Sequence, residues 1–341
     1  MRNPCLAAGL IAMLLLAACS SGGDSASPSV TVSPRPTQTP TRTPTPTRTP
    51  TATRTATPTP VPTPLPSSDP ITAPFELPVL MYHDVSDTPP NDIYRAPLNV
   101  RPDVFSRQMD YLECAGYTAI TPSRMAEAIA GRGALPPKPV ILTFDDGYAD
   151  QYTDAFPILE RHGMTGAFSI ITGYAEAGGE YMTWSQIETM AGAGMEMMSH
   201  TVTHIDLNVA DDATALGQLR DSRLAISQHT GRAPAFLVFP SGEPFRSGTA
   251  ERQAQIVSMA AAAGYSGAFL AGPASTTQDP SHPFQFNRFR VDGSTDLVTF
   301  ADMVGGPPAA DCPGVATPAT GPAYGRGSAT SEQNSPLPGE S

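Results

Sequence analysis

The sequence predicts an α/β fold in which a parallel sheet or barrel is surrounded by helices. Two observations support this prediction. Between residues 75 and 304, short apolar runs of strand length alternate with longer segments whose apolar residues recur at helical spacing. The prolines gather outside that block, because 14 of the 38 lie in residues 28–74 and seven in residues 305–341. We therefore expect one globular domain over residues 75–304.

The expected strands and helices follow one another through this block. The expected strands are residues 78–82, 117–120, 140–144, 165–171, 195–199, 235–239, 265–270 and 289–291. The expected helices are residues 104–116, 121–130, 155–162, 184–193, 212–231, 250–263 and 297–304. Because helices separate most of the strands, the strands are expected to run parallel.

Local signals support the individual elements in order. The first helix has apolar residues at positions 104, 105, 109 and 112 and stops at Gly116. Pro122 lies at the entry of the second helix, where proline is tolerated. Residues 140–144 form an apolar run of the length of a buried strand, and later helices end at Gly194 and Gly264.

The N-terminal residues have the features of an export signal. Arg2 precedes an apolar run at residues 6–18, which is too short to span a bilayer and is followed by Cys19. The small residues before Cys19 resemble a bacterial lipobox, which implies removal of residues 1–18 and a two-chain lipid on Cys19. We expect the protein on the extracellular face of the envelope, anchored in the cell membrane or outer membrane.

Two segments are expected to lie outside the fold. In residues 19–74, Thr-Pro and Thr-Arg pairs alternate, and proline favours an extended spacer there. Residues 305–341 are rich in proline and glycine and are expected to form a disordered tail. Cys312 lies in this tail and Cys114 on a helix, so we expect Cys114 as a buried free thiol, although export permits a disulfide.

The charge argues against a nucleic-acid partner. The formal net charge is −12, and phosphate backbones are bound mainly by lysine and arginine. A neutral or cationic partner fits an acidic domain better. We expect a monomer that binds no nucleic acid.

Two adjacent carboxylates, Asp145 and Asp146, directly follow an apolar strand. Neighbouring acids cannot both be buried and ionised without a cation or hydrogen-bond partners. Successive side chains at a strand end point in different directions, so one aspartate can bind a metal while the other faces a water. Taken alone, the motif also fits a simple Asp-Asp-Gly turn.

His200 and His204 are four residues apart, which brings both imidazoles to one side of a tight loop. Neutral imidazole is a common ligand of zinc and similar metals. One aspartate and two histidines would form a three-ligand site with open positions, as in hydrolytic metal centres. Thr201 stands where a zincin would carry its base, so Asp145 is the available base. Taken alone, the pair also fits two solvated loop histidines.

In this order and context, the motifs resemble the polysaccharide deacetylase family, the NodB-like carbohydrate esterases. Residues 77–83 resemble the opening strand of the family, residues 142–148 its first motif and residues 199–204 its second. Residues 181–184 resemble the branch that begins with a Tyr-His strand. The resemblance implies a distorted (β/α) barrel of about seven parallel strands. It also implies removal of N- or O-acetyl groups from a glycan with the aid of a divalent metal.

The resemblance also implies roles for single residues. Asp146, His200 and His204 would hold the metal, and Asp145 would take the proton from the attacking water. A backbone N–H near Ser241 would help to stabilise the oxyanion. Zinc is the expected metal, with cobalt, nickel or iron as alternatives.

The third and last motifs depart from the family pattern. Residues 238–242 lack the arginine that in the family pairs with the base, and Arg288 and Arg232 are the candidates to replace it. The general acid of the family is a histidine in the last motif, where only His282 lies nearby. His83 follows the first strand and is expected at the mouth of the pocket, as a group that contacts the substrate or supports the site.

These observations predict an extracellular enzyme that removes acetyl groups from an acetylated polysaccharide, with N-acetyl groups as the preferred target. The expected substrates are peptidoglycan, chitin-like chains or poly-N-acetylglucosamine. One alternative is an O-acetyl esterase acting on xylan or an envelope glycan. A second alternative is a catalytically degenerate glycan-binding protein, which the missing motif residues favour. Trp184 fits either a sugar-stacking residue or a packing residue at a helix start.

Overall fold

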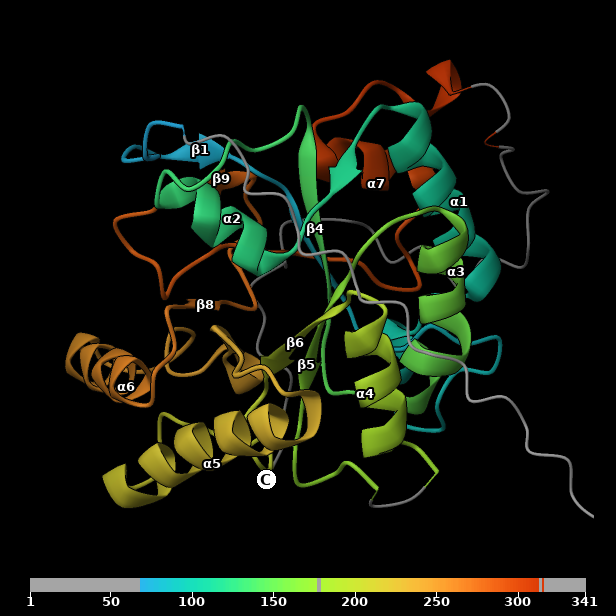
Figure 1. The fold of residues 1–341 in the computed structure, drawn as a ribbon. Coiled ribbons are helices and arrows are strands. Elements are labelled where there is room, and N and C mark those ends of the chain that lie inside the picture. The colour runs from blue at the N-terminus through green and yellow to red at the C-terminus, as the bar shows by residue number, and fades with distance from the viewer. Residues whose placement is uncertain (1–67, 177–178, 313–314, 316–341) are drawn as a thin grey trace, which may run out of the picture. The chain divides into compact units, whose positions relative to one another are not determined.

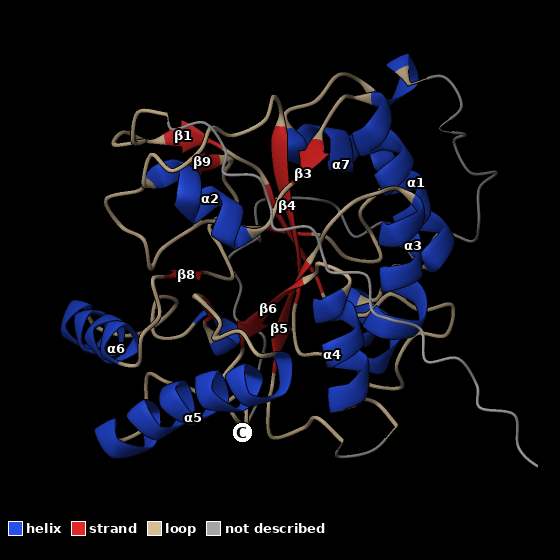
Figure 2. Ribbon diagram, viewed as in Figure 1, coloured by secondary structure: helices blue, strands red, loops and turns tan. Residues whose placement is uncertain are grey.

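The computed structural model describes residues 68–176, 179–312 and 315, and all of them belong to one compact unit. Figure 1 shows the course of the chain, and Figure 2 shows strands at the centre with helices outside them. The expected signal peptide, Cys19, the spacer up to residue 67 and the tail from residue 316 lie outside the described residues. Within the described ranges, no helix combines the length and apolarity that a bilayer span requires.

Parallel strands form the central sheet. In the described part of the chain, seven strands follow the order β10-β2-β4-β5-β6-β7-β8, and β3 pairs with β4 outside this path. Every pairing in it is parallel. The strands are β2 (Val79–Tyr82), β3 (Thr118–Ala119), β4 (Pro139–Phe144), β5 (Ala167–Ile170), β6 (Glu196–Ser199), β7 (Phe236–Val238), β8 (Gly267–Phe269) and β10 (Phe289–Arg290). The predicted distorted barrel of about seven parallel strands is confirmed.

One short segment, residues 286–290, links the two ends of the sheet. Phe286 pairs in parallel with Phe269 of β8, and its backbone bonds with Ala268 and Leu270. A few residues later, Phe289 and Arg290 of β10 pair with β2. The sheet therefore curls into a barrel, and Arg288 lies between the two pairings.

Each expected helix is found, with ends within two residues of the prediction. The helices are α1 (Pro102–Cys114), α2 (Pro122–Ile129), α3 (Phe156–Arg161), α4 (Trp184–Gly192), α5 (Asp212–Thr230), α6 (Ala250–Ala262) and α7 (Leu297–Val304). The side chains of five residues cap first-turn N–H groups, which explains where those helices begin. These capping residues are Thr121, Thr183, Asp211, Thr249 and Asp296. Helix α1 packs against α3 and α7, and α5 packs against α4 and α6 (Figure 1).

Alternate residues of β2 and β4 divide between two of the three hydrophobic clusters of the described residues. Val79 and Ile141 lie in one buried cluster, whereas their neighbours Leu80 and Leu142 lie in another. This division follows from the period of two along a strand, because successive side chains point to opposite faces of the sheet. One cluster packs against α1 and α3 outside the sheet, and the other fills the inner face.

Several short elements of the described residues were not expected. Strands β1 (Phe75–Glu76) and β9 (Thr277–Gln278) pair antiparallel in a separate two-stranded sheet. A π-helical turn at Gln151–Ala155 leads into α3. Two-residue strands and a single π turn are too short to show a hydrophobic period, so the sequence pattern does not reveal them.

The folded part begins before the expected boundary at residue 75. The Ser68 N–H donates to the Gly131 carbonyl, and the Ile71 N–H donates to the Ile129 carbonyl. Residues 68–71 therefore pair with the C-terminal end of α2, where helix carbonyls lack partners within the helix. The last part of the expected spacer belongs to the fold.

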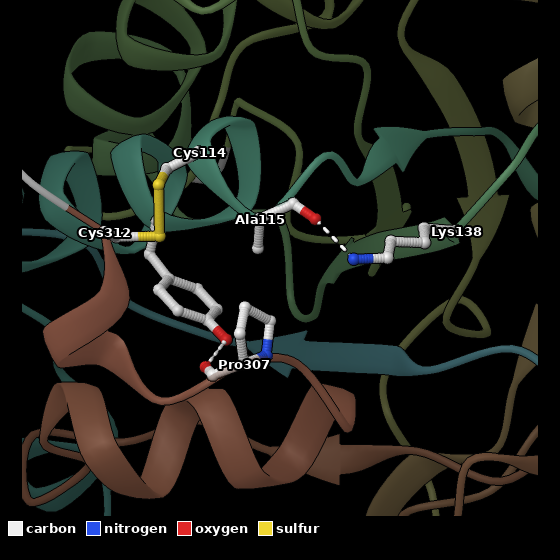
Figure 3. The surroundings of a disulfide bond; sticks show 6 residues. Cys114, Ala115, Lys138, Pro307 and Cys312 are labelled. Atoms are coloured by element: carbon white, nitrogen blue, oxygen red, sulfur yellow. Dashed lines mark hydrogen bonds between the residues drawn. A yellow bond between two sulfur atoms is a disulfide. The ribbon is translucent and has the colours of Figure 1, made fainter.

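The chain also continues in folded form beyond Val304. Gly305 adopts a left-handed conformation and ends α7, and the next residues lead to a 3-10 turn at Ala309–Asp311. Cys312 is buried and forms a disulfide with Cys114, with their Cα atoms 5.8 Å apart (Figure 3). The expectation of a free Cys114 is therefore wrong, because residues 305–312 turn back onto the last turn of α1.

A hydrogen bond from α1 holds this returning segment, and a second bond fixes the end of α1 beside the disulfide. The Tyr111 hydroxyl donates to the Pro307 carbonyl at 2.6 Å. Lys138 donates to the Ala115 carbonyl at 2.8 Å, next to Cys114 (Figure 3). The first eight residues of the expected disordered tail, residues 305–312, thus belong to the fold.

Candidate active site

The chemically distinctive residues follow strands that end at the same edge of the sheet. Asp145 and Asp146 follow β4, and His200 follows β6, two strands away. His204 comes at the end of the turn that follows His200. Because parallel strands present their carboxyl ends at one edge, these residues meet there.

Three side chains converge as a candidate metal centre. One potential ligand atom from each of Asp146, His200 and His204 lies within 4.8 Å of the others. The His200 Nε2 is 3.3 Å from Asp146 Oδ1, and the His204 Nε2 is 3.6 Å from the same oxygen. One carboxylate and two imidazoles leave coordination positions open, so the set fits a zinc-like cation of a hydrolytic site.

A second contact fixes the orientation of His200. Its Nδ1 lies 2.8 Å from the Val238 carbonyl at the end of β7. A carbonyl can only accept, so Nδ1 carries a proton, and Nε2 is the ring nitrogen that faces Asp146. Burial lowers the pKa of His200, but the bond to Asp146 and the charge of Asp145 outweigh it and raise the pKa.

Asp146 stays ionised although it is buried. Burial raises the pKa of its carboxyl group. The bond with His200 and the charges of His83, His200 and His204 lower the pKa by a larger amount. The net result is a pKa well below the ordinary value. An ionised carboxylate facing two imidazole nitrogens is the form in which aspartate binds a metal.

Asp145 points to a different partner, Arg288. Two guanidinium nitrogens of Arg288 donate to the two carboxylate oxygens of Asp145, each at 2.8 Å. The Ser169 hydroxyl donates to Oδ1 at 2.7 Å. Burial raises the pKa of Asp145, but the charge of Arg288 outweighs it and the pKa falls to about 2.

Arg288 is itself fixed by the barrel wall. Its Nε donates to the Leu270 carbonyl at 2.7 Å, and its Nη1 donates to the Thr143 hydroxyl at 3.1 Å. Only 1% of its surface is exposed. Arg232 is exposed and lies beyond the end of α5. Of the two arginine candidates, the structure therefore places Arg288 against Asp145.

His83 lies close to the two aspartates. Its charge contributes to lowering the pKa of both Asp145 and Asp146. Its Nδ1 is buried and has no hydrogen-bond partner in the described part of the chain. His282 is instead exposed and bonds to Asp279 in a surface turn at 2.9 Å. The structure therefore brings His83, and not His282, to the site.

Backbone strain gathers at the same edge. Six non-glycine residues of the described ranges have positive φ, and four of them are Asp146 (φ 74°), Thr201 (φ 64°), His204 (φ 57°) and Ser241 (φ 53°). Left-handed backbone costs free energy for residues with a Cβ atom and persists only where the surroundings impose it. Ser241, in the turn after β7, thus shares this feature with two of the candidate ligands.

The structure adds one residue to the site and distinguishes between the two interpretations of another. Ser169 was missed, although a serine within the otherwise apolar strand β5 is a visible signal. The Trp184 ring stacks on the His229 ring at 4.0 Å and 4°, which joins α4 to α5. This contact favours the packing interpretation of Trp184.

Comparison with known proteins agrees with this geometry. Residues 132–267 match the family model described as polysaccharide deacetylase. Over this range the chain is similar to the polysaccharide deacetylase family. The matched range contains Asp145, Asp146, His200 and His204, whereas His83 and Arg288 lie outside it.

Two curated relatives show how far the similarity extends. A Bacillus subtilis (strain 168) protein named as a polysaccharide deacetylase, YxkH, is 30% identical over 169 residues, which are 50% of this chain and 58% of that protein. The poly-β-1,6-N-acetyl-D-glucosamine N-deacetylase of Escherichia coli (strain K12) is 27% identical over 137 residues, which are 36% of this chain and 20% of that protein. The matched part thus spans less than two thirds of either relative.

Solved structures share the fold. The Streptococcus pyogenes deacetylase PplD, solved with acetate, superimposes with a TM-score of 0.60 at 25% identity, over 68% of this chain and 99% of that one. A Bacillus anthracis protein named for the same family gives a TM-score of 0.58 at 26% identity, over 68% of this chain and 69% of that one.

Proposed function

We propose that the protein is a metal-dependent hydrolase that removes acetyl groups from an extracellular polysaccharide, with N-acetyl groups as the preferred target. The observation that supports this most is the pairing of two sets of residues at one edge of the barrel. Asp146, His200 and His204 converge on one point, and the neighbouring Asp145 is held ionised by Arg288. The domain's family and the name of the Escherichia coli relative support the choice of an N-acetylated polysaccharide.

Asp146, His200 and His204 would hold the metal through one carboxylate oxygen and two Nε2 atoms. We propose zinc, with cobalt, nickel or iron as alternatives. When bound, such a cation polarises the acetyl carbonyl and makes a water molecule more acidic. The bond from His200 Nδ1 to Val238 keeps the ring turned for this contact, as partners of ligating histidines do.

Asp145 is proposed to take the proton from the attacking water. The two bonds from Arg288 and the bond from Ser169 fix the plane of the carboxylate, so that the base is oriented before the substrate arrives. A pKa of about 2 keeps the Asp145 carboxylate ionised at neutral pH. The interpretation as a degenerate binding protein was supported by a missing arginine and a missing acid histidine, and Arg288 supplies a guanidinium at the proposed base.

His83 is proposed to donate the proton that the leaving amine takes when the carbon–nitrogen bond breaks. It follows β2, which lies on one side of β4, whereas His200 follows β6 on the other side. His83 and His200 thus approach the two aspartates from opposite sides of β4. The backbone N–H near Ser241 is proposed to stabilise the oxyanion, as donors of this kind do in acyl transfer.

Localisation is proposed from the N-terminal sequence. Cleavage before Cys19 and lipid attachment to it would anchor the protein in the membrane, with a Thr/Pro-rich spacer ahead of the catalytic domain. This arrangement suits a monomeric enzyme that acts on an extended glycan outside the cell. Nucleic acid is not proposed as a partner, because the net charge is −12.

The test is acetate release from defined oligosaccharides that carry either N-acetyl or O-acetyl groups. We expect release from the N-acetylated series, loss of release with a chelator and its return when zinc is added back. Asp145→Asn and His200→Ala should each lose most of the activity. Full activity in both variants would contradict the proposal, and release from only the O-acetylated series would favour the esterase.

A further inference from the structure

Three tyrosines form a continuous row of ring contacts beside the candidate metal centre. The ring centroids of Tyr148 and Tyr181 are 5.3 Å apart, with an angle of 31° between the rings. The centroids of Tyr181 and Tyr174 are 5.0 Å apart, with an angle of 53°. We call these three residues the tyrosine row.

Both ends of the tyrosine row are tied to residues next to the candidate ligands. Tyr148 comes two residues after Asp146 in the chain. The Tyr174 hydroxyl lies 3.5 Å from the carbonyl of Thr203, the residue before His204. The row thus runs from the aspartate side of the metal centre to its histidine side.

The middle of the row is also close to the centre. Burial and, next, the negative charge of Asp146 raise the pKa of Tyr181 to about 12. Tyr148 and Tyr181 are joined by an antiparallel bridge, and the Met182 N–H donates to the Gly147 carbonyl at 2.9 Å. The backbone that carries the row is therefore fixed to the turn that carries Asp146.

The three tyrosines differ in exposure along the row. Tyr148 is buried, and the Arg95 guanidinium lies 3.6 Å from its ring centre. Tyr181 and Tyr174 are only half-buried, so part of their surface faces solvent. Tyr148 and Arg95 support the row from within, and Tyr181 and Tyr174 present ring surface that the fold does not cover.

The core does not require these half-exposed rings. Neither Tyr174 nor Tyr181 belongs to the buried hydrophobic clusters. Aromatic rings that are fixed in place and partly exposed bind flat apolar surfaces at a small entropic cost. The C–H faces of pyranose rings are such surfaces, and a polysaccharide presents several of them in succession.

We infer that the tyrosine row is a glycan subsite, on which Tyr181 and Tyr174 stack the pyranose rings next to the sugar that loses its acetyl group. This inference rests on the proposed function and deepens it, because it assigns a binding surface to the polymer rather than to the acetyl group. It implies that longer oligosaccharides are better substrates, since short ones cannot reach both the metal centre and the row.

The experiment compares substrates of different length. Acetate release is measured on monomer, dimer and hexamer of the oligosaccharide series that the wild-type protein deacetylates fastest. Tyr181→Ala is expected to raise the KM for the hexamer about tenfold, the effect of losing about 1.4 kcal/mol of stacking, and to reduce the preference for hexamer over monomer. Tyr181→Phe, which keeps the ring, should retain the preference. Trp184→Ala is the matched control, because it removes an aromatic ring that packs between α4 and α5.

A binding measurement separates the two proposals. Hexamer binding is measured by calorimetry in Asp145→Asn, which retains the row, and in the double variant that adds Tyr181→Ala, with folding of each checked by circular dichroism. We expect about tenfold weaker binding in the double variant. If the wild-type protein releases no acetate from any series, the proposed function fails while this comparison still tests the row.

Two results would overturn the inference. One is equal hexamer affinity in the two proteins. The other is an active enzyme whose length preference is the same in wild type, Tyr181→Ala and Tyr174→Ala. Tyr174→Ala also serves as the second variant if Tyr181→Ala does not fold.

Discussion

Asp145 and Arg288 are buried together, and each depends on the other. Three percent of the Asp145 surface and 1% of the Arg288 surface are exposed. Removing a charge from water costs several kcal/mol, which the partner and its hydrogen bonds must offset. Here the pair is bidentate, Ser169 donates to the carboxylate, and Thr143 and Leu270 accept from the guanidinium. The pair therefore stabilises the fold and orients the proposed base at the same time.

Replacing Arg288 should damage both stability and activity. We expect Arg288→Met to lower the free energy of unfolding by about 3–5 kcal/mol, because Asp145 is left as an unpaired buried charge. Arg232→Met is the matched control and should change it by less than about 0.5 kcal/mol, since Arg232 is exposed. Urea denaturation and acetate release measure the two effects. Equal stability of the two variants would contradict the assignment of Arg288.

The pKa of Asp145 predicts an acid-dependent loss of stability. Its pKa in the folded protein is about 2, below the ordinary value, so its contribution is present above pH 4 and is lost as the pH falls towards 2. We expect the metal-free wild-type protein to lose about 2 kcal/mol more between pH 4 and pH 2 than Asp145→Asn does. Urea denaturation at a series of pH values measures this. Parallel curves for the two proteins would show that Asp145 does not titrate with folding.

At the scale of elements, α5 holds the turn that carries the histidines. The Gln218 side-chain carbonyl accepts from the N–H groups of Val202 and Thr203, at 2.8 and 3.0 Å. The Thr201 hydroxyl accepts from the N–H of His204 at 3.1 Å. Gln218 therefore fixes the backbone of the turn from α5, and Thr201 fixes the backbone of His204 from within the turn.

Loss of the Gln218 side chain should weaken metal binding without unfolding the protein. We expect Gln218→Ala to lower zinc affinity by about tenfold to a hundredfold, the range found when groups that support metal ligands are removed. Gln228→Ala, an exposed position on the same helix, is the control. Competition with a chromophoric chelator measures the affinity. If both variants bind zinc as wild type does, the turn does not depend on Gln218.

The elements themselves follow from local rules, and most were predictable. Helices such as Asp212–Thr230 begin at a capping side chain and end at a left-handed glycine, and both signals lie in adjacent residues. Buried strands such as Pro139–Phe144 are visible as apolar runs. The pair β1 and β9 was not predictable, because its two strands are two residues long and about 200 residues apart.

At the scale of the whole molecule, the disulfide joins two distant parts of the chain. Cys114 and Cys312 are separated by 198 residues, so the bond excludes many extended conformations of the unfolded chain. It also keeps residues 305–312 against α1, where Tyr111 bonds to Pro307. The disulfide therefore fixes residues next to Cys312 to α1 by a covalent bond.

Breaking this bond should lower stability without abolishing activity. We expect the double variant Cys114→Ser, Cys312→Ser to lose about 2–5 kcal/mol of unfolding free energy. The wild-type protein with a reductant should match it, and the reductant should not affect the double variant. Urea denaturation with and without dithiothreitol measures this. A wild-type protein that is insensitive to reduction and equal to the variant would contradict a stabilising disulfide.

The sequence by itself determined the order of the main strands and helices and indicated the Asp145-Asp146 and His200-His204 motifs, because each depends on residues that are close together in the chain. Residue type and spacing predicted a metal site of one aspartate with His200 and His204, and the resemblance to the family assigned Asp146 as that aspartate. The tertiary structure decided everything that depends on distant residues. Arg288 meets Asp145 across 143 residues, from the segment that links the two ends of the sheet. Closure of the barrel brings such residues together, and no local pattern encodes that contact.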